Sequence, residues 1–252
     1  MRTYGLVGFP LGHSFSRTFF SGKFAQEGKN EQYLNFEIPS IDLVKELIDT
    51  HHELVGLNVT IPYKTAIMPF LDEVDAVAKQ IGAVNTILIR HDSEGKSILK
   101  GYNTDAYGFL NSLKPLLMPH HQKALVLGSG GASKAVAYAF GELGIAHTMV
   151  SRDASKGLDY SGITEEIMHE HTILVNTTPL GTFPDTNTKP DIPYHWISDR
   201  HLLYDLVYNP PLTSFLQEGA ARKAQVKNGY EMLVLQALKA YEIWNSKDFQ
   251  AG

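Results

Sequence analysis

The chain of 252 residues contains no cysteine. This absence excludes a disulfide framework, a zinc site built on thiolates and a cysteine nucleophile. Long apolar runs are missing as well: glycine and proline interrupt residues 1–10, and no later stretch approaches the length of a membrane span. We therefore expect no signal peptide, no membrane partner and a cytoplasmic protein.

The chain also lacks an excess of basic residues. Its 22 Lys and Arg are outnumbered by 27 Asp and Glu, which gives a formal net charge of -5 at pH 7. Because binding to a phosphate backbone needs a basic surface, we expect no nucleic-acid partner. The histidine pairs His51-His52 and His120-His121 lie in polar stretches without the spacing of metal ligands, so we expect no metal. Whether the protein is a monomer or a homodimer stays open.

Apolar runs alternate with amphipathic stretches almost throughout, which is typical of βαβ units and a largely parallel sheet. In the N-terminal part the pattern predicts strands at 4–7, 33–38 and 57–60, helices at 16–26, 41–49 and 72–81, and a hairpin of strands 85–90 and 97–102. Gly82 is expected to close the third helix in a left-handed conformation.

A second unit is expected to begin near Thr104. Its predicted elements are strands at 123–127, 147–150, 172–175 and 202–207, a helix at 132–143 and a loop-dominated segment at 181–200. The last helix, 231–244, has an apolar surface too broad for an exposed terminal helix, so we expect it to return to the first domain. The predicted fold class is α/β with two domains: residues 1–103 with the returning segment 230–252, and a Rossmann-type, doubly wound domain of residues 104–229.

A buried strand followed by a glycine-rich turn and a helix, residues 124–133, indicates nucleotide binding. Gly128 permits the tight turn, and Gly130 lets the backbone approach a pyrophosphate at the helix N-terminus, where free N–H groups favour anions. Ser133 replaces the third glycine of the dinucleotide fingerprint with another small residue. Such a turn can also merely join a strand to a helix, but its place between the two favours a dinucleotide.

The residues after the next strand bear on the choice of dinucleotide. NAD sites usually place an acid there, which accepts hydrogen bonds from the ribose hydroxyls. Here Arg152 could stack on adenine and pair with a 2′-phosphate, and Lys156 adds a second positive charge, which together favour NADP. Asp153 is the one residue that could favour NAD.

Polar residues also gather at predicted strand ends in the N-terminal half. Ser14 and Ser16 enter a helix, where one could be an N-cap or both could bind a carboxylate. Asn58 and Thr60 share one face of a strand, and Lys64 follows where Pro62 ends that strand. A lysine so placed is a candidate for catalysis, although most lysines are simply surface charges.

Two further polar residues allow two interpretations each. Asp105 follows the segment 101–104 and could cap a helix or act in catalysis. Gln236 lies among apolar residues of the last helix. It would be costly to bury without a partner, so it either contacts a ligand or faces solvent.

Taken together and in this order, these segments resemble the shikimate dehydrogenase family. The resemblance rests on Asn58-Val-Thr-Ile-Pro-Tyr-Lys64, Gly82-Ala-Val-Asn-Thr86 and Asn103-Thr-Asp105, and it extends to the later segments Gly128–Ala132, Asn176–Gly181 and Asp205–Pro210. It therefore covers essentially the whole chain. Two departures are the run Arg17-Thr18-Phe19-Phe20, where the family usually has proline and then His-Asn, and Asp153, where many members have threonine.

The resemblance implies an NADP-dependent oxidoreductase that interconverts 3-dehydroshikimate and shikimate in aromatic amino acid and chorismate biosynthesis, with NAD a less favoured cofactor. It implies Lys64 and Asp105 as the catalytic pair: Lys64 handles the proton on the developing alkoxide and Asp105 orients it. The substrate ligands implied are Ser14, Ser16, Asn58, Thr60, Asn85, Tyr208 and Gln236. The cofactor residues implied are Gly128, Ser129, Gly130, Gly131, Ala132, Ser133, Ser151, Arg152, Lys156, Thr178, Leu206 and Gly229.

Three alternatives stay open. The first is an NAD-dependent quinate or shikimate dehydrogenase. The second is a folate-linked dehydrogenase on the same architecture, which the serine pair and the Asn-Thr-Asp segment disfavour. The third is a non-catalytic sensor of nucleotide or ring acid, against which the presence of both Lys64 and Asp105 argues.

Overall fold

The computed structural model describes residues 1–12 and 14–246 and divides into two compact units. Unit 1 comprises Met1–Thr104 and Ala237–Gly252, and unit 2 comprises Asp105–Gln236. The first border lies between Thr104 and Asp105. The second border lies inside the last helix, so the first turns of that helix belong to unit 2.

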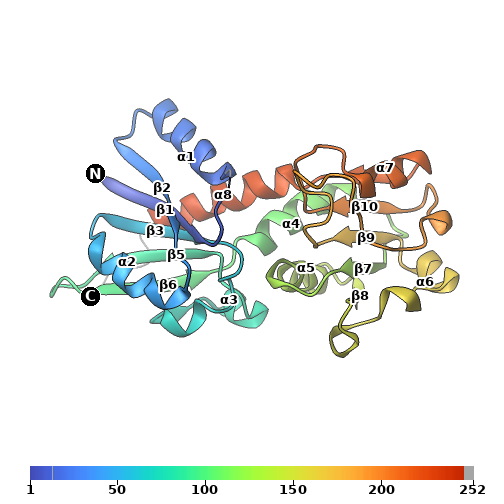
Figure 1. The fold of residues 1–252 in the computed structure, drawn as a ribbon, viewed down its shortest axis with the longest axis horizontal. Coiled ribbons are helices and arrows are strands. Elements are labelled where there is room, and N and C mark those ends of the chain that lie inside the picture. Colours follow the sequence, from blue (N-terminus) through green and yellow to red (C-terminus); the bar gives the residue numbers. More distant parts are fainter. Residues whose placement is uncertain (13, 247–252) are drawn as a thin grey trace. The chain divides into compact units, whose positions relative to one another are not determined.

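Unit 1 is a three-layer α/β unit (Figure 1). Its elements are β1 (Arg2–Gly8), α1 (Phe15–Gln26), β2 (Glu31–Glu37), α2 (Val44–Thr50), β3 (Leu54–Val59), β4 (Glu73–Val74), α3 (Ala76–Ile81), β5 (Thr86–His91) and β6 (Ser97–Tyr102). The strand order is β2-β1-β3-β5-β6-β4. Strands β2, β1 and β3 are parallel, whereas β5 is antiparallel to both β3 and β6, so this sheet is mixed.

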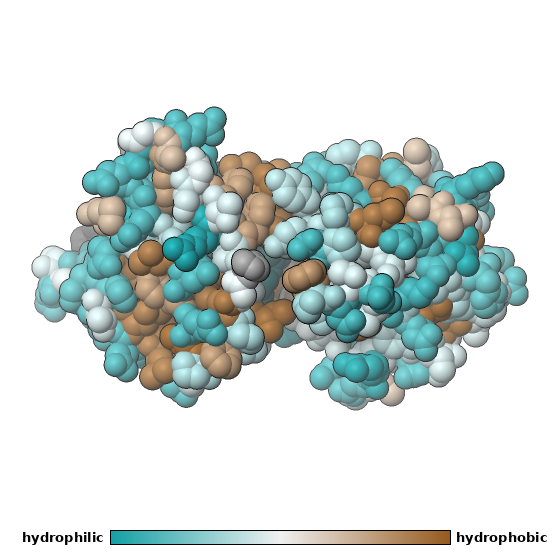
Figure 2. Space-filling view, turned by 45° about the horizontal axis from the view of Figure 1, so that its top comes forward, coloured by the Kyte–Doolittle hydropathy of each residue, from teal (hydrophilic) through white to brown (hydrophobic). Residues whose placement is uncertain are grey.

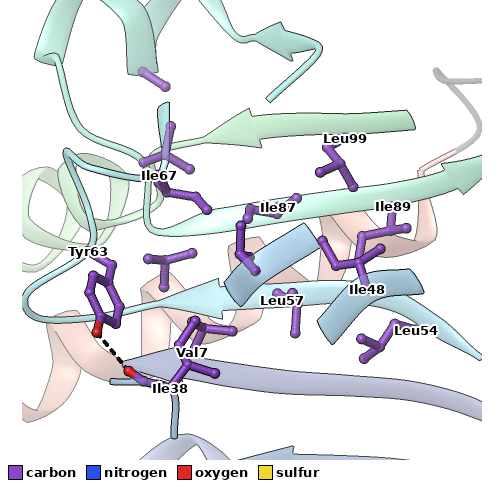
Figure 3. Close-up of a cluster of buried hydrophobic side chains, with 14 residues drawn as sticks. Val7, Ile38, Ile48, Leu54, Leu57, Tyr63, Ile67, Ile87, Ile89 and Leu99 are labelled. Atoms are coloured by element: carbon purple, nitrogen blue, oxygen red, sulfur yellow. Dashed lines mark hydrogen bonds between the residues drawn. The ribbon is translucent and has the colours of Figure 1, made fainter. Parts of the chain in front are cut away.

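Apolar side chains cover both faces of this sheet. On one face, aliphatic side chains of the strands pack with those of α2 and α3, and the Tyr63 hydroxyl donates to the Ile38 carbonyl at 2.7 Å (Figure 3). On the other face, aromatic residues of β1, α1 and β2 pack with Ala237, Ala240 and Trp244. The C-terminal half of the last helix therefore completes the core of unit 1, as the breadth of its apolar surface predicts.

The helix predicted at 72–81 begins later than expected. Residues 72–75 instead pair with β6: the Asp72 N–H donates to the Leu99 carbonyl at 3.0 Å, and the Asp75 N–H donates to the Gly101 carbonyl at 2.9 Å. The Asp75 side chain then caps α3 by accepting from the Val77 N–H. Gly82 ends α3 with φ 70°, which confirms the predicted left-handed cap.

Unit 2 contains a fully parallel sheet of order β11-β10-β9-β7-β8 (Figure 1). Its elements are α4 (Asp105–Leu113), β7 (Lys123–Leu127), α5 (Gly131–Glu142), β8 (Ala146–Val150), α6 (Glu165–Glu170), β9 (Ile173–Asn176), β10 (Leu202–Asp205), α7 (Ser214–Ala221), β11 (Gln225–Lys227) and the first turns of α8 (Tyr230–Asn245). The strand order reverses between β7 and β9, which is the switch point where doubly wound sheets bind ligands.

Successive residues of each buried strand in unit 2 face opposite layers. Ala124 and Val126 of β7 pack with residues of α4 and α5, whereas Leu125 and Leu127 pack with residues of α6 and α7. Such a strand reads as a continuous apolar run, which is why it could be predicted. The strand predicted at 202–207 is shorter than expected and ends at Asp205, because the chain turns there under hydrogen bonds to the Asp205 side chain.

The surface of each unit carries hydrophilic side chains with hydrophobic side chains among them (Figure 2). The most exposed large apolar side chains of the units are Ile61, with 70% of its surface accessible, and Phe183, with 65%. Within residues 1–12 and 14–246, no helix combines the length and the apolar character needed to cross a bilayer.

Candidate functional sites in the two units

Strand directions bring three polar segments of unit 1 together. Because β5 runs antiparallel to β3 and β6, the end of β3, the start of β5 and the end of β6 meet at one edge of the sheet. Asn58 therefore pairs with Thr86, which in turn pairs with Tyr102. Asn58, Asn85 and the segment 103–104 therefore lie side by side.

Asn58 is 5% exposed, and its side chain is engaged within unit 1. Its amide nitrogen donates to the Asn85 carbonyl at 3.3 Å and to the Thr86 hydroxyl at 3.2 Å. Its amide oxygen accepts from the Tyr33 hydroxyl at 2.8 Å. Both amide hydrogens are thus used by the protein, and Asn58 holds the end of β3 against the start of β5.

Asn85 joins the ends of β5 and β6. Its side-chain oxygen accepts from the Thr104 N–H at 2.7 Å, and its amide nitrogen donates to the Thr104 hydroxyl at 3.0 Å. Thr86 donates to the same oxygen at 3.1 Å. Buried polar groups that satisfy one another in this way form a rigid network, so the edge is preorganised.

The loop that carries Lys64 is attached to the same edge. The Thr60 N–H donates to the Val7 carbonyl at 2.9 Å, and the Val84 N–H donates to the Lys64 carbonyl at 2.7 Å. The buried ring of Tyr63, next to Lys64, fastens the loop to Ile38 (Figure 3). The backbone of the half-buried Lys64 is therefore held beside the residue that precedes Asn85.

The two serines occupy different positions at the start of α1. Ser14 is the N-cap, and its hydroxyl oxygen accepts from the Arg17 N–H at 3.2 Å. This is the structural role that one serine alone could fill, and it leaves the hydroxyl hydrogen able to donate. Ser16 is 9% exposed and interacts with the hydroxyl of Tyr33, which partly opposes the rise of the Tyr33 pKa caused by burial.

The glycine turn of unit 2 lies at the switch point of the sheet. Gly128 has φ 118°, and a Cβ there would lie 2.6 Å from the Thr177 hydroxyl, so only glycine fits. Gly130 is the N-cap of α5 and provides no side-chain cap, and the space where its Cβ would lie is open. Gly131 and Ala132 begin α5, and Ser133 closes the turn by donating to the Gly130 carbonyl at 2.6 Å.

The loop after β8 lies next to this turn. Ser151 donates to the exposed Ser129 hydroxyl at 3.1 Å and accepts from the Asp153 N–H at 3.2 Å. Asp153 caps the short turn 154–156, because its carboxylate accepts from Ser155 and forms an ion pair with Lys156 at 3.1 Å. These contacts lower the pKa of Asp153. Both Asp153 and Lys156 are thus engaged with each other, and Arg152 is exposed beside them.

The ends of β9 and β10 carry the other predicted cofactor residues. Thr178 follows β9, and its N–H and hydroxyl both donate to the side chain of Asn176, at 3.0 and 2.7 Å. Leu206 follows β10, and its N–H donates to the Asn176 carbonyl at 3.0 Å. The Gly229 N–H donates to the Val207 carbonyl at 3.2 Å, which brings the start of α8 to the same strand ends.

The remaining predicted residues also belong to unit 2. Asp105 is buried and begins α4, and Gln236 is 6% exposed in α8. The Gln236 amide donates to the Leu233 carbonyl at 2.9 Å. The low exposure of this side chain contradicts the solvent-facing alternative. Burial raises the pKa of the half-buried Tyr208. Among the described residues, no three His, Asp or Glu side chains are grouped so that they could hold a metal.

The sequence pattern alone did not single out several polar residues that build these edges. They are Tyr33, Thr86 and Thr104 in unit 1, and Asn176, Asp205 and Thr213 in unit 2. Asn176 and Asp205 carry a usable signal, since each is a polar residue that closes a run of apolar strand residues. Tyr33 carries none, because its hydroxyl partner is distant in sequence.

Comparison with known proteins shows to which family this chain belongs. Residues 6–87 match the model of the shikimate dehydrogenase substrate binding domain. The shikimate dehydrogenase (NADP(+)) of Carboxydothermus hydrogenoformans is 38% identical over 95% of this chain and 90% of that protein. The chain belongs to the shikimate dehydrogenase family. The family predicted from the sequence and the two-domain α/β fold class are thereby confirmed.

Solved structures of this family and of a related enzyme extend the comparison. Shikimate 5-dehydrogenase from Thermus thermophilus, in complex with NADP(H) and shikimate, has a TM-score of 0.81 and 32% identity, and the match covers 97% of this chain and 94% of that chain. Quinate dehydrogenase from Corynebacterium glutamicum, in complex with NAD, has a TM-score of 0.85 and 27% identity over 97% of this chain and 93% of that chain. The architecture is therefore shared by enzymes with different substrates and cofactors, and the residues of this chain must decide between them.

Proposed function

We propose that this chain is an NADP-dependent shikimate dehydrogenase, which reversibly reduces 3-dehydroshikimate to shikimate. Membership of the family over nearly the whole chain supports the reaction class. The observation that favours NADP over NAD is the state of Asp153, whose carboxylate is held by Ser155 and Lys156 as a local cap. A carboxylate so engaged is poorly placed to accept from ribose hydroxyls, whereas the exposed Arg152 can pair with a 2′-phosphate.

The glycine turn of unit 2 fits a dinucleotide. The open space beside Gly130 and the first N–H groups of α5, which no side chain caps, suit a pyrophosphate. We propose that the cofactor is held by Gly128, Ser129, Gly130, Gly131, Ala132, Ser133, Ser151, Arg152, Lys156, Thr178, Leu206 and Gly229. When bound, NADPH supplies the hydride for the ring ketone.

The residues of the chain then have to bind the ring acid and manage one proton. We propose that the Lys64 ammonium stabilises the developing alkoxide and donates the proton, and that Asp105 orients Lys64 and accepts from a neighbouring ring hydroxyl. Ser16 and the remaining hydroxyl hydrogen of Ser14 would donate to the substrate carboxylate, with Tyr208 assisting. The proposed ligands of the ring hydroxyls are Asn58, Thr60, Asn85 and Gln236. Since the Asn58 amide hydrogens are engaged, we propose that Asn58 contributes mainly by fixing Asn85 and Thr86.

The test is a spectrophotometric assay at 340 nm with four combinations of substrate and cofactor: shikimate or quinate with NADP or NAD. We expect shikimate with NADP to give the highest kcat/KM. A preference for quinate with NAD would replace the proposal with the first alternative. No turnover in any combination, with retained binding of NADPH or shikimate, would support a sensor.

A further inference from the structure

A buried carboxylate lies at the end of β10 in unit 2, and the proposed reaction does not require it. Asp205 closes β10, is completely buried, and accepts hydrogen bonds from three separate segments. One oxygen accepts from the Asn176 amide at 2.9 Å and from the Val207 N–H at 3.0 Å. The other accepts from the Thr213 hydroxyl at 2.5 Å. One side chain thus ties the end of β9, the loop after β10 and the start of α7 together.

Asn176 carries this connection into the loop that follows β9. While its amide nitrogen donates to Asp205 and to the Leu180 carbonyl at 3.3 Å, its oxygen accepts from the N–H and the hydroxyl of Thr178. The orientation of the Asn176 amide is therefore fixed at both ends. If the Asp205 contact were lost, the amide would keep only its contacts within the loop, to Thr178 and Leu180, and the loop 177–181 would no longer be tied to the end of β10 through this side chain.

The loop after β10 depends on the same carboxylate. Its Val207 N–H donates to Asp205, and its Leu206 N–H donates to the Asn176 main chain. Both loops lie at the carboxyl ends of strands next to the switch point, which is the edge where open α/β sheets bind ligands. They carry Thr178 and Leu206, which are proposed to contact the cofactor.

Burial of a carboxylate at this position costs free energy, so the side chain is expected to have a specific role. Burial raises the pKa of Asp205 to about 6, while the donors from Thr213, Val207 and Asn176 oppose the rise. An ionised carboxylate offers only acceptors, so it can serve all three donors at once, whereas an amide in its place would require the Thr213 hydroxyl to accept instead of donate. The arrangement therefore selects Asp for orienting these donors rather than for filling space.

We propose that Asp205 is a positioning residue of the cofactor site, which fixes the loops 177–181 and 206–208 through Asn176 and Val207. This inference rests on the proposed function, because it takes unit 2 to be the NADP-binding unit. Asp205 is not required to touch the cofactor.

The experiment compares three variants of the full chain: Asp205→Ala, Asn176→Ala and Thr213→Val. Thr213→Val is the matched control, because it removes one hydrogen bond to the same carboxylate and the cap of α7 but leaves the Asn176 connection in place. The readouts are the Kd for NADPH from its fluorescence, the KM for NADP and for shikimate, the melting temperature, and amide hydrogen exchange of the loops 177–181 and 206–208.

We expect Asp205→Ala and Asn176→Ala to raise the Kd for NADPH and the KM for NADP by roughly tenfold, which corresponds to about 1.4 kcal/mol. The KM for shikimate should rise less than the KM for NADP, because Tyr208 is the one proposed substrate ligand that lies in these two loops. Hydrogen exchange of the two loops should be faster in both variants. Thr213→Val should lower the melting temperature while the Kd for NADPH changes little.

Two results would overturn the positioning role. One is an unchanged Kd for NADPH in folded Asp205→Ala and Asn176→Ala. The other is an equal rise of that Kd in Thr213→Val, which would make the effect one of general stability. Wild-type protein is measured first. If it binds no NADPH, the proposed function itself fails, and this failure is distinct from a normal wild type with unaffected variants.

Discussion

The contact between Gly56 and Trp244 provides the sharpest test of how unit 1 is assembled. Gly56 lies in the middle of β3, and a Cβ placed on it would lie 2.3 Å from the indole Nε1 and 2.4 Å from Cδ1 of Trp244. The indole is completely buried and donates to the Ile87 carbonyl at 3.0 Å. Gly56→Ala therefore forces the ring to move or the strand to bend.

The expected cost combines two terms. Overpacking of a well-filled core costs about 1–3 kcal/mol. If the indole moves so far that its hydrogen bond to Ile87 is lost, a further contribution of about 1 kcal/mol follows. We expect Gly56→Ala to lower the free energy of unfolding by about 2–4 kcal/mol in total.

Urea unfolding followed by tryptophan emission measures this change. The chain has two tryptophans, so a Trp196→Phe background isolates the signal of Trp244. Gly22→Ala is the matched control: Gly22 lies in α1 with nothing within 4 Å of an added Cβ, and alanine there should stabilise by about 0.5–1 kcal/mol. A Gly56→Ala protein as stable as the wild type, with unchanged Trp244 emission, would refute the packing described for this helix.

Three other outcomes are expected. Lys64→Ala should lower kcat by roughly 10²–10⁴-fold with the Kd for NADPH unchanged, and near-normal turnover would remove Lys64 from the mechanism. Arg152→Ala should raise the KM for NADP by about tenfold or more and leave the KM for NAD unchanged. Asp153→Ala should raise neither of these KM values. A KM for NADP that does not respond to the loss of Arg152 would contradict the cofactor assignment. Burial lowers the pKa of His121 and His201 below the ordinary 6.5. The protein is therefore most stable with respect to these two residues above pH 6.5, where both rings are neutral, and it loses stability as the pH falls toward their lower folded-state pKa values. In this pH range, the urea midpoint of His201→Gln should depend less on pH than that of the wild type.

Features set by neighbours in sequence could be predicted. The strand 123–127, the glycine turn and the left-handed Gly82 each follow from a local pattern, and all three are present. The segment 72–75 was predicted wrongly as helix because its pairing with β6 depends on residues far along the chain. Local propensity carries no information about such a partner.

In the candidate sites as well, local features could be predicted and contacts between distant residues could not. Lys64 and the residues of the strand edge near Asn85 could be named because short motifs mark them. The contacts that fix their geometry could not, since the Tyr33–Asn58 bond spans 25 residues and the Asn176–Asp205 bond spans 29. For Ser14 the structure shows the N-cap, and this role is compatible with carboxylate binding because the cap uses only the hydroxyl oxygen.

The border between the units inside α8 has a consequence for synthesis on the ribosome. Residues 105–236 are contiguous, so unit 2 can complete its core as soon as that stretch has emerged. Unit 1 cannot, because Trp244 and its neighbours fill one face of its sheet and are made after unit 2. Residues 1–104 are thus translated before unit 2 but finish folding after it, and the nascent chain must keep a face rich in exposed aromatic rings from aggregating until Trp244 has emerged.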